Sequence, residues 1–160
     1  MLMRKAMHTM CEWKAKENRK SLVISGARQI GKTYIVRAFG KESYESFVEL
    51  NFIENPEYKA IFEGGLDVDS LLLNLSLYVP TAKFIPGKTL ILLDEIQECA
   101  EAVTSLKFWT QDQRYDVVAT GSGLGMNYRQ TSSYPVGNVE YMNMYALDFE
   151  EFLWANNVSQ

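Results

Sequence analysis

Two patterns of apolar residues alternate along this chain, and each pattern predicts a different kind of element. Met3, Ala6, Met7, Met10 and Trp13 recur every three or four residues, as on one face of an amphipathic helix. Elsewhere the apolar residues form short, nearly continuous runs rich in β-branched side chains, which are typical of buried strands. These strand-like runs cover residues 21–25, 47–52, 89–93, 115–120 and 139–145.

Helical patterns lie between the strand-like runs. The pattern at residues 33–39 is expected to end at Gly40, because glycine favours the ends of helices. Pro56 opens a short helix that reaches Phe62, since proline is well tolerated at the first helical position. Further helical patterns cover residues 98–111, with Ala102, Leu106 and Trp109 on one side, and residues 149–155.

One more helix is predicted between two breaks in the pattern. Asp67 or Asp69 can cap its start, and Pro80 stops it, because the residue before proline avoids the helical conformation. Its apolar face is expected to consist of Leu71, Leu72, Leu75 and Tyr78. Strands that alternate with helices, and that are apolar nearly throughout, predict an α/β fold with a parallel sheet covered on both faces.

Composition narrows the class of protein. With 160 residues, of which 47% are hydrophobic, the chain suits one globular domain. Its net charge of −4 and pI near 5.1 disfavour binding of nucleic acid through bulk positive charge. The sequence has no apolar run approaching the roughly 18 residues of a membrane span and no apolar signal-peptide core, so we expect a cytoplasmic protein. Cys11 and Cys99 form no C-x-x-C pair, which favours incidental thiols.

The strand-like run at residues 21–25 leads into a phosphate-binding motif. The segment matches G-x-x-x-x-G-K-[ST], the Walker A pattern, without a mismatch. It consists of Gly26, Ala27, Arg28, Gln29, Ile30, Gly31, Lys32 and Thr33. A nucleoside triphosphate is the implied ligand, because Lys32 can reach the β- and γ-phosphates and Thr33 can ligate Mg²⁺. We include the next residue, Tyr34, in the predicted nucleotide-binding segment. Arg28 and Gln29 can contact the nucleotide or a neighbouring subunit, or can be exposed loop residues that serve only the turn.

An acidic pair follows the apolar run Leu90–Leu93. If this strand is adjacent to the phosphate-loop strand, Asp94 lies at the same carboxyl edge of the sheet, where open α/β folds bind ligands. Its carboxylate can hold Mg²⁺, usually through water, in the manner of a Walker B motif. Glu95 lies one residue farther along and can orient or deprotonate an attacking water. The pair therefore predicts a hydrolase.

Thr120 ends another apolar run, so its hydroxyl is expected at the same edge, where it can align water or sense phosphate. Ser122, between two glycines, is a rival for this role. An N-K-x-D motif is absent, which disfavours a GTPase, and only Arg129 is present in a segment where a small-molecule kinase has an arginine-rich lid. The strand at residues 47–52 suits ATPases in which an extra strand lies between the phosphate-loop strand and the acid-bearing strand.

ATP hydrolysis is therefore the leading reaction, and two alternatives stay open. One is a nucleotide-dependent interaction switch with little turnover. The other is a phosphotransferase acting on a small acceptor.

The motifs together resemble the successive signatures of a large group of prokaryotic AAA+-like ATPases. The matching segments are Gly26–Thr33, Leu93–Gln97, Ala119–Ser122 and Tyr145–Leu153. The resemblance implies a three-layer α/β/α P-loop NTPase with a mostly parallel sheet of about five strands. It also implies ATP and Mg²⁺ as ligands, Lys32, Thr33, Asp94 and Glu95 as the nucleotide and catalytic set, and Thr120 or Ser122 as the sensor.

In that family the ATPase domain is usually followed by a C-terminal domain, so the resemblance implies that this chain is an N-terminal ATPase domain without its downstream neighbour. We divide residues 1–160 into an N-terminal helix (1–18), a nucleotide-binding core (19–125), and a loop, last strand and C-terminal helix (126–160). The aromatic residues within Phe149–Trp154 pack on the domain's own sheet or on another domain or partner.

One position departs from the family pattern. Many members carry a Gly-Arg pair before the last strand, whereas here Gly137 is followed by Asn138. Arg129 is the remaining candidate for an arginine finger, a group that can raise the rate a thousandfold or more. The sequence therefore allows a slow ATPase, or one completed by a partner or a second subunit.

Overall fold

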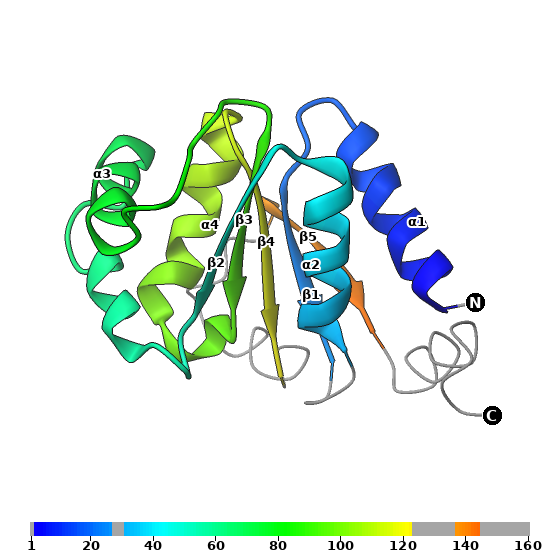
Figure 1. Cartoon of the computed structure of the whole chain (residues 1–160), viewed down its shortest axis with the longest axis horizontal. Coiled ribbons are helices and arrows are strands. Elements are labelled where there is room, and N and C mark those ends of the chain that lie inside the picture. The colour runs from blue at the N-terminus through cyan, green and yellow to red at the C-terminus, as the bar shows by residue number, and fades with distance from the viewer. Residues whose placement is uncertain (1, 27–30, 123–136, 145–160) are drawn as a thin grey trace.

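The computed structural model describes residues 2–26, 31–122 and 137–144, and its elements alternate along the chain (Figure 1). The helices are α1 (Leu2–Ala15), α2 (Lys32–Ser43), α3 (Val68–Tyr78) and α4 (Ala100–Asp112), with the 3-10 helices η1 (Pro56–Phe62) and η2 (Ile96–Glu98). The strands are β1 (Ser21–Ser25), β2 (Ser46–Asn51), β3 (Thr89–Asp94), β4 (Asp116–Gly121) and β5 (Val139–Asn143). The predicted α/β class is confirmed.

The five strands form one parallel sheet in the order β2-β3-β4-β1-β5. The strand that ends at Asp94 is therefore not adjacent to the strand that leads into the phosphate loop, because β4 lies between them. This corrects the expectation of direct adjacency and confirms an inserted strand, while β2 lies at the outer edge. Since all strands run the same way, Asp94 and Thr120 still share the carboxyl edge of the sheet with Gly26.

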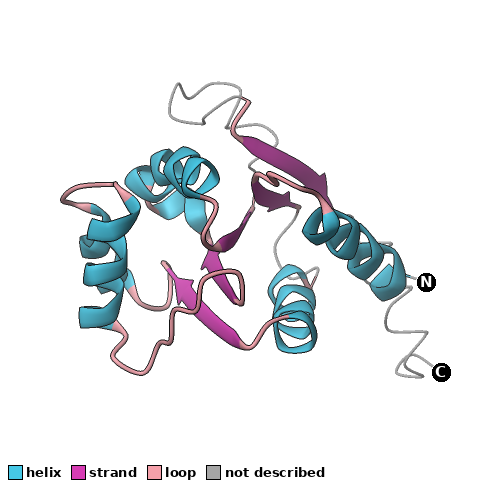
Figure 2. Cartoon of the chain, turned by 90° about the horizontal axis from the view of Figure 1, so that it is seen from above, coloured by secondary structure: helices cyan, strands magenta, loops and turns pink. Residues whose placement is uncertain are grey.

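Helices cover both faces of the sheet (Figure 2). Helices α1 and α2 pack on one face, in a cluster that includes Trp13 and Phe39. Helices α3 and α4 pack with η1 on the other. Strand β3 shows why both layers are needed, because Leu90 and Leu92 belong to the first cluster while Ile91 and Leu93 belong to the second. Successive side chains of a strand point to opposite faces, so a continuous apolar run is buried on both sides.

The prediction that Gly40 ends its helix is wrong. Helix α2 continues to Ser43, and Gly40 lies inside it. A Cβ built on Gly40 would be 2.5 Å from Cδ1 of Phe47 on β2. Glycine is therefore needed at this position for close packing of α2 on the sheet, not for ending the helix.

The predicted apolar face of α3 is correct only in part. Asp67 is the N-cap, with its carboxylate accepting a hydrogen bond from the Ser70 amide. Hydrogen bonding to the Ser70 side chain, and secondly to its amide, holds the pKa of Asp67 below its usual range. Leu71 and Leu75 are buried, but Tyr78 is 42% exposed. The chain leaves the helix at Val79, which packs against the core in its place.

The remaining predicted boundaries shift by small amounts. The helix predicted at 98–111 corresponds to α4, which begins at Ala100, two residues after η2 ends at Glu98, and Ala102, Leu106 and Trp109 are buried along α4 as expected. The last predicted strand ends at Asn143. The predicted helix at 149–155 lies outside the described residues.

Candidate functional site

The phosphate-loop segment joins β1 to the amino end of α2, in the strand, loop, helix order predicted from the sequence. Of its eight residues, the structure describes Gly26, Gly31, Lys32 and Thr33, while residues 27–30 lie outside the described part. Gly31 has a φ of 87° and is the N-cap of α2, which no side chain caps. A left-handed conformation at this point requires glycine, and the uncapped amides at a helix start favour anions.

Lys32 and Thr33 begin α2 and point in different directions. Lys32 is buried, and its Nζ donates a hydrogen bond to the carbonyl oxygen of Gly26 at 3.0 Å. Thr33 donates its hydroxyl to Oδ2 of Asp94 on β3 at 2.9 Å. The start of α2 is therefore connected both to the beginning of the phosphate loop and to the acid-bearing strand.

Asp94 is the centre of the site. It is 3% exposed. Its Oδ2 accepts hydrogen bonds from the hydroxyl of Thr33 and from the amide of Asn51 at 3.2 Å, and its Oδ1 accepts one from the hydroxyl of Thr120. These groups come from α2, β2, β3 and β4. Each of the three donors is electrically neutral, so within the described residues a buried carboxylate is bound without a cation.

The role of Asn51 was not predicted from the sequence. Asn51 and Asp94 are partners in the register of β2 and β3. The side-chain oxygen of Asn51 accepts hydrogen bonds from the amides of Ile53 and Glu54, both at 2.9 Å, which turns its Nδ2 toward Asp94. The signal that could have found Asn51 is the one used for Thr120: a polar side chain at the end of a buried strand.

Glu95 follows β3 in a left-handed conformation with φ of 58° and ψ of 50°. Such a conformation costs a non-glycine residue roughly 1 kcal/mol or more. Oε1 of Glu95 accepts a hydrogen bond from Nε2 of Gln97 at 2.9 Å. Among the described residues, the Glu95 carboxylate takes no part in the hydrogen bonds around Asp94. Sequence reasoning did not single out Gln97.

Thr120 and Ser122 now differ in environment. Thr120 is fully buried and donates to Asp94. The hydroxyl of Ser122 is buried without a hydrogen-bond partner in the described part of the chain. The structure therefore brings Thr120, and not Ser122, to Asp94.

The other predicted residues are less informative. Tyr34 is 56% exposed on α2. Ala27, Arg28, Gln29 and Ile30 of the loop, the proposed arginine Arg129, and the aromatic segment Phe149–Trp154 all lie outside the described residues.

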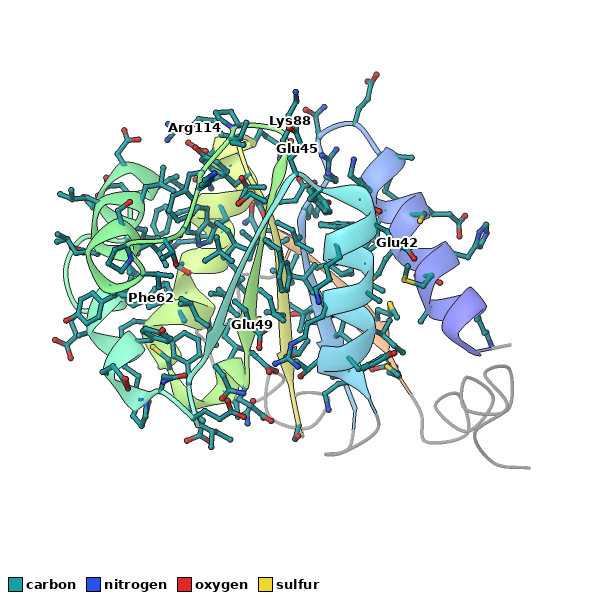
Figure 3. All side chains as sticks on the ribbon, in the orientation of Figure 1. Glu42, Glu45, Glu49, Phe62, Lys88 and Arg114 are labelled. Atoms are coloured by element: carbon teal, nitrogen blue, oxygen red, sulfur yellow. The ribbon has the colours of Figure 1, made fainter. Side chains whose placement is uncertain are left out.

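A guanidinium close to the site is bound by a carboxylate other than Asp94. Arg37 on α2 donates Nε and Nη2 to the carboxylate of Glu49 at 2.7 and 2.6 Å; Glu49 is labelled on β2 in Figure 3. The hydrogen bond to Glu49 is the main cause of the raised pKa of Arg37, and the negative charges of Asp94 and Glu54 add to it. Asp94 therefore acts on Arg37 through its field, while Glu49 holds the guanidinium.

The donor set fits Mg²⁺. This ion prefers oxygen ligands and usually keeps several waters, with only one or two protein ligands, and the Thr33 hydroxyl and Asp94 carboxylate are such a pair. No group of three or more His, Cys, Asp or Glu side chains that could hold a metal ion gathers in residues 2–26, 31–122 or 137–144. None of the described helices is long and apolar enough to cross a membrane.

A parallel five-stranded sheet of this order, with the glycine motif before α2 and an acid at the end of β3, is typical of AAA+ P-loop domains. A family model described as an AAA domain matches residues 18–153. The chain therefore belongs to the AAA domain family, whose members are generally nucleotide-binding ATPases.

Solved structures of other proteins share this fold, and two of them illustrate the likeness. The Orc1 protein of Aeropyrum pernix, solved in complex with DNA, is 16% identical and superposes with a TM-score of 0.57 over 98% of this chain and 50% of its own length. PCH-2 of C. elegans is 12% identical, with a TM-score of 0.53 over 90% of this chain and 43% of its own. The chain thus spans about half of either protein. Curated protein sequences yielded no match.

Proposed function

We propose that this domain binds ATP together with Mg²⁺ and hydrolyses it, acting as a motor or switch for an attached domain. The observation that carries the proposal is the buried carboxylate of Asp94, which contacts Thr33 of the phosphate-loop motif and Thr120 of β4 at the carboxyl edge of the sheet. Glu95, the next residue, supplies a second carboxylate beside this cluster.

Binding of the nucleotide is assigned to the loop and the start of α2. The uncapped amides of α2 attract phosphate oxygens, and Lys32 can exchange its bond to the Gly26 carbonyl for the β- and γ-phosphates. Thr33 and Asp94 would hold Mg²⁺, which neutralises developing charge on the phosphates. Asn51 keeps the Asp94 carboxylate oriented through its amide.

Hydrolysis requires a group that orients water and accepts its proton. Glu95 is proposed for this role, because a carboxylate at the end of β3 can reach the nucleophile side of the γ-phosphate and take the proton on its free oxygen. Thr120, already bonded to Asp94, is proposed to sense whether the γ-phosphate is present. In this assignment the two acids have separate tasks, with Asp94 for the metal and Glu95 for water.

The test is steady-state release of phosphate from Mg-ATP. Glu95→Gln should lower turnover by about a hundredfold or more while nucleotide binding persists. The matched control is Glu98→Gln, the same chemical change at an exposed position in η2, which should leave turnover at the wild-type rate. Lys32→Ala should abolish thermal stabilisation by Mg-ATP, and undiminished stabilisation would refute the placement of the phosphates.

A nucleotide-dependent switch with little turnover is the second candidate. It is favoured by Asn138, which follows Gly137 where many family members have arginine. The same assay separates the two. Wild-type protein that binds Mg-ATP but releases phosphate no faster than Glu95→Gln would leave the switch as the function.

A further inference from the structure

Only one of the two polar atoms of the Gln97 side-chain amide has a hydrogen-bond partner among the described residues. Its Nε2 donates to Oε1 of Glu95 at 2.9 Å, whereas its Oε1 is buried with no hydrogen-bond partner among the described residues. Gln97 lies in η2, which follows β3 and packs against α4 and the end of β4. The amide therefore lies between the hydrophobic layer and the candidate site.

Packing alone does not explain a glutamine at position 97, because the unsatisfied amide oxygen lowers the stability of the fold. A buried amide oxygen without a donor loses its hydration and gains nothing in return, and an apolar side chain of similar length would fill the same volume without that loss. The orientation of the amide is also determined, because turning it over would place its oxygen against the Glu95 carboxylate. The contact that accounts for a glutamine at this position is the one with Glu95.

Glu95 needs the hydrogen bond from Gln97, because the position of its backbone does not determine the position of its carboxylate. The residue is in a left-handed conformation at the start of η2, and among the described residues the only hydrogen-bond donor to its carboxylate is the Gln97 amide. A carboxylate that orients water must be held within a fraction of an ångström of its working position. One donor on Oε1 leaves Oε2 available for water.

We propose that Gln97 is a positioning residue for Glu95, holding one carboxylate oxygen so that the other meets the attacking water. The inference rests on the proposed ATP hydrolysis. It predicts that Gln97 serves turnover at the expense of the stability of the fold, since its own oxygen is left unsatisfied.

The first test separates positioning from packing. Gln97→Met removes the amide and keeps the length of the side chain. We expect turnover, measured as kcat for Mg-ATP, to fall roughly tenfold to a hundredfold, while KM stays within a factor of two to three and the melting temperature stays equal or rises. Gln111→Met, at an exposed position on α4, is the control and should match wild type in all three quantities.

A double variant tests whether Gln97 acts through Glu95. In the Glu95→Gln background, Gln97→Met should leave the residual kcat unchanged, because the carboxylate that it positions is no longer there. A further fall of tenfold or more, or a lower melting temperature in either background, would show that Gln97 supports the fold instead and would overturn the proposal.

A second measurement does not depend on turnover. The side-chain amide of Gln97 gives ¹H–¹⁵N signals that should move in Glu95→Ala toward the position of the exposed Gln111 amide. Unchanged signals would mean that the contact does not exist in solution and would overturn the proposal. Wild-type protein without turnover, but with this shift, would instead remove the proposed hydrolysis and leave the Gln97–Glu95 contact established.

Discussion

In the described part of the chain, each end of the sheet has one buried carboxylate, and the two carboxylates are bound in opposite ways. At the amino end, Asp116 of β4 is 8% exposed and is bound by a cation. At the carboxyl end, Asp94 of β3 is 3% exposed and is bound by neutral donors alone. A buried charge is costly unless it is paired, so the two carboxylates contribute differently to the fold.

We call the amino end of the sheet the closed end, because the charge of Asp116 is neutralised by a cation within the chain. Arg19 donates Nε and Nη2 to the two oxygens of Asp116, both at 2.8 Å, and the hydroxyl of Tyr44 adds a third bond at 2.6 Å. Around it lie exposed ion pairs, such as Lys88 with Glu45 at 3.0 Å (Figure 3). A forked guanidinium on a carboxylate satisfies both groups. This end has a structural role, joining the α1–β1 connection and the end of α2 to β4.

We call the carboxyl end of the sheet the open end, because no cation contacts Asp94 among the described residues. The hydroxyls of Thr33 and Thr120 and the amide of Asn51 satisfy the lone pairs of Asp94 without neutralising its charge. A divalent cation would supply the missing positive charge. The comparison shows how a buried structural acid differs from the acid that we propose to hold Mg²⁺ in the same sheet: Asp116 has a contacting counter-charge within the chain.

The largest effect on stability is expected from a substitution that removes the ion pair at the closed end. Asp116→Ala leaves Arg19, whose side chain is 24% exposed, without its partner and removes the acceptor of the Tyr44 hydroxyl. We expect the free energy of unfolding, measured with urea, to fall by about 3 kcal/mol. The control is Glu140→Ala, which removes the more exposed pair with Lys16 and should cost less than about 1 kcal/mol. Equal losses of unfolding free energy in the two variants would mean that the Arg19–Asp116 pair stabilises the fold no more than an exposed surface ion pair does.

The next prediction concerns stability at the open end. Asp94→Asn removes a buried charge that no cation contacts among the described residues, so relief of the desolvation cost offsets the hydrogen bonds that are lost. Without nucleotide and Mg²⁺, we expect the free energy of unfolding to change by less than about 1 kcal/mol, while thermal stabilisation by Mg-ATP disappears. A loss as large as that of Asp116→Ala would show that Asp94 is structural and would contradict the comparison.

The sequence predicted the open end better than the closed end, and the reason is physical. Lys32, Thr33, Asp94 and Thr120 each follow or end a predicted strand or loop, and parallel strands bring such positions to one edge whatever the order of the strands. Asn51 was missed because the predicted strand ran to Phe52 and so placed Asn51 inside it, whereas β2 ends at Asn51. Its contact with Asp94 also depends on β2 lying beside β3, which local patterns do not reveal.

The closed end depends on packing that local patterns do not encode. Arg19, Tyr44 and Asp116 come from three separate segments, and nothing in their spacing brings them together. Gly40 was misread for the same reason, since its role is the approach of Phe47 from another element. Gln97 was missed because the left-handed turn at Glu95, which brings the two side chains together, is not apparent in the sequence.

The last prediction tests the comparison through the pH dependence of stability. Burial raises the pKa of Tyr44, and the charge and hydrogen bond of Asp116 raise it further. The folded state therefore keeps the Tyr44 proton where the unfolded chain, with a tyrosine pKa of about 10, loses it, so stability is retained below pH 10 and falls as the pH rises above it.

Tyr44→Phe removes this titration together with the hydrogen bond to Asp116. We expect the variant to be less stable than wild type by about 1–2 kcal/mol at pH 8, and the difference to shrink between pH 9 and pH 11, because only wild type pays the cost of keeping its tyrosine protonated. Urea unfolding of both proteins across this range measures the difference while cancelling the lysines that titrate in both. A difference that is constant with pH would mean that the Tyr44 hydroxyl is in contact with water, and that the amino end of the sheet is more open than the contacts of Asp116 indicate.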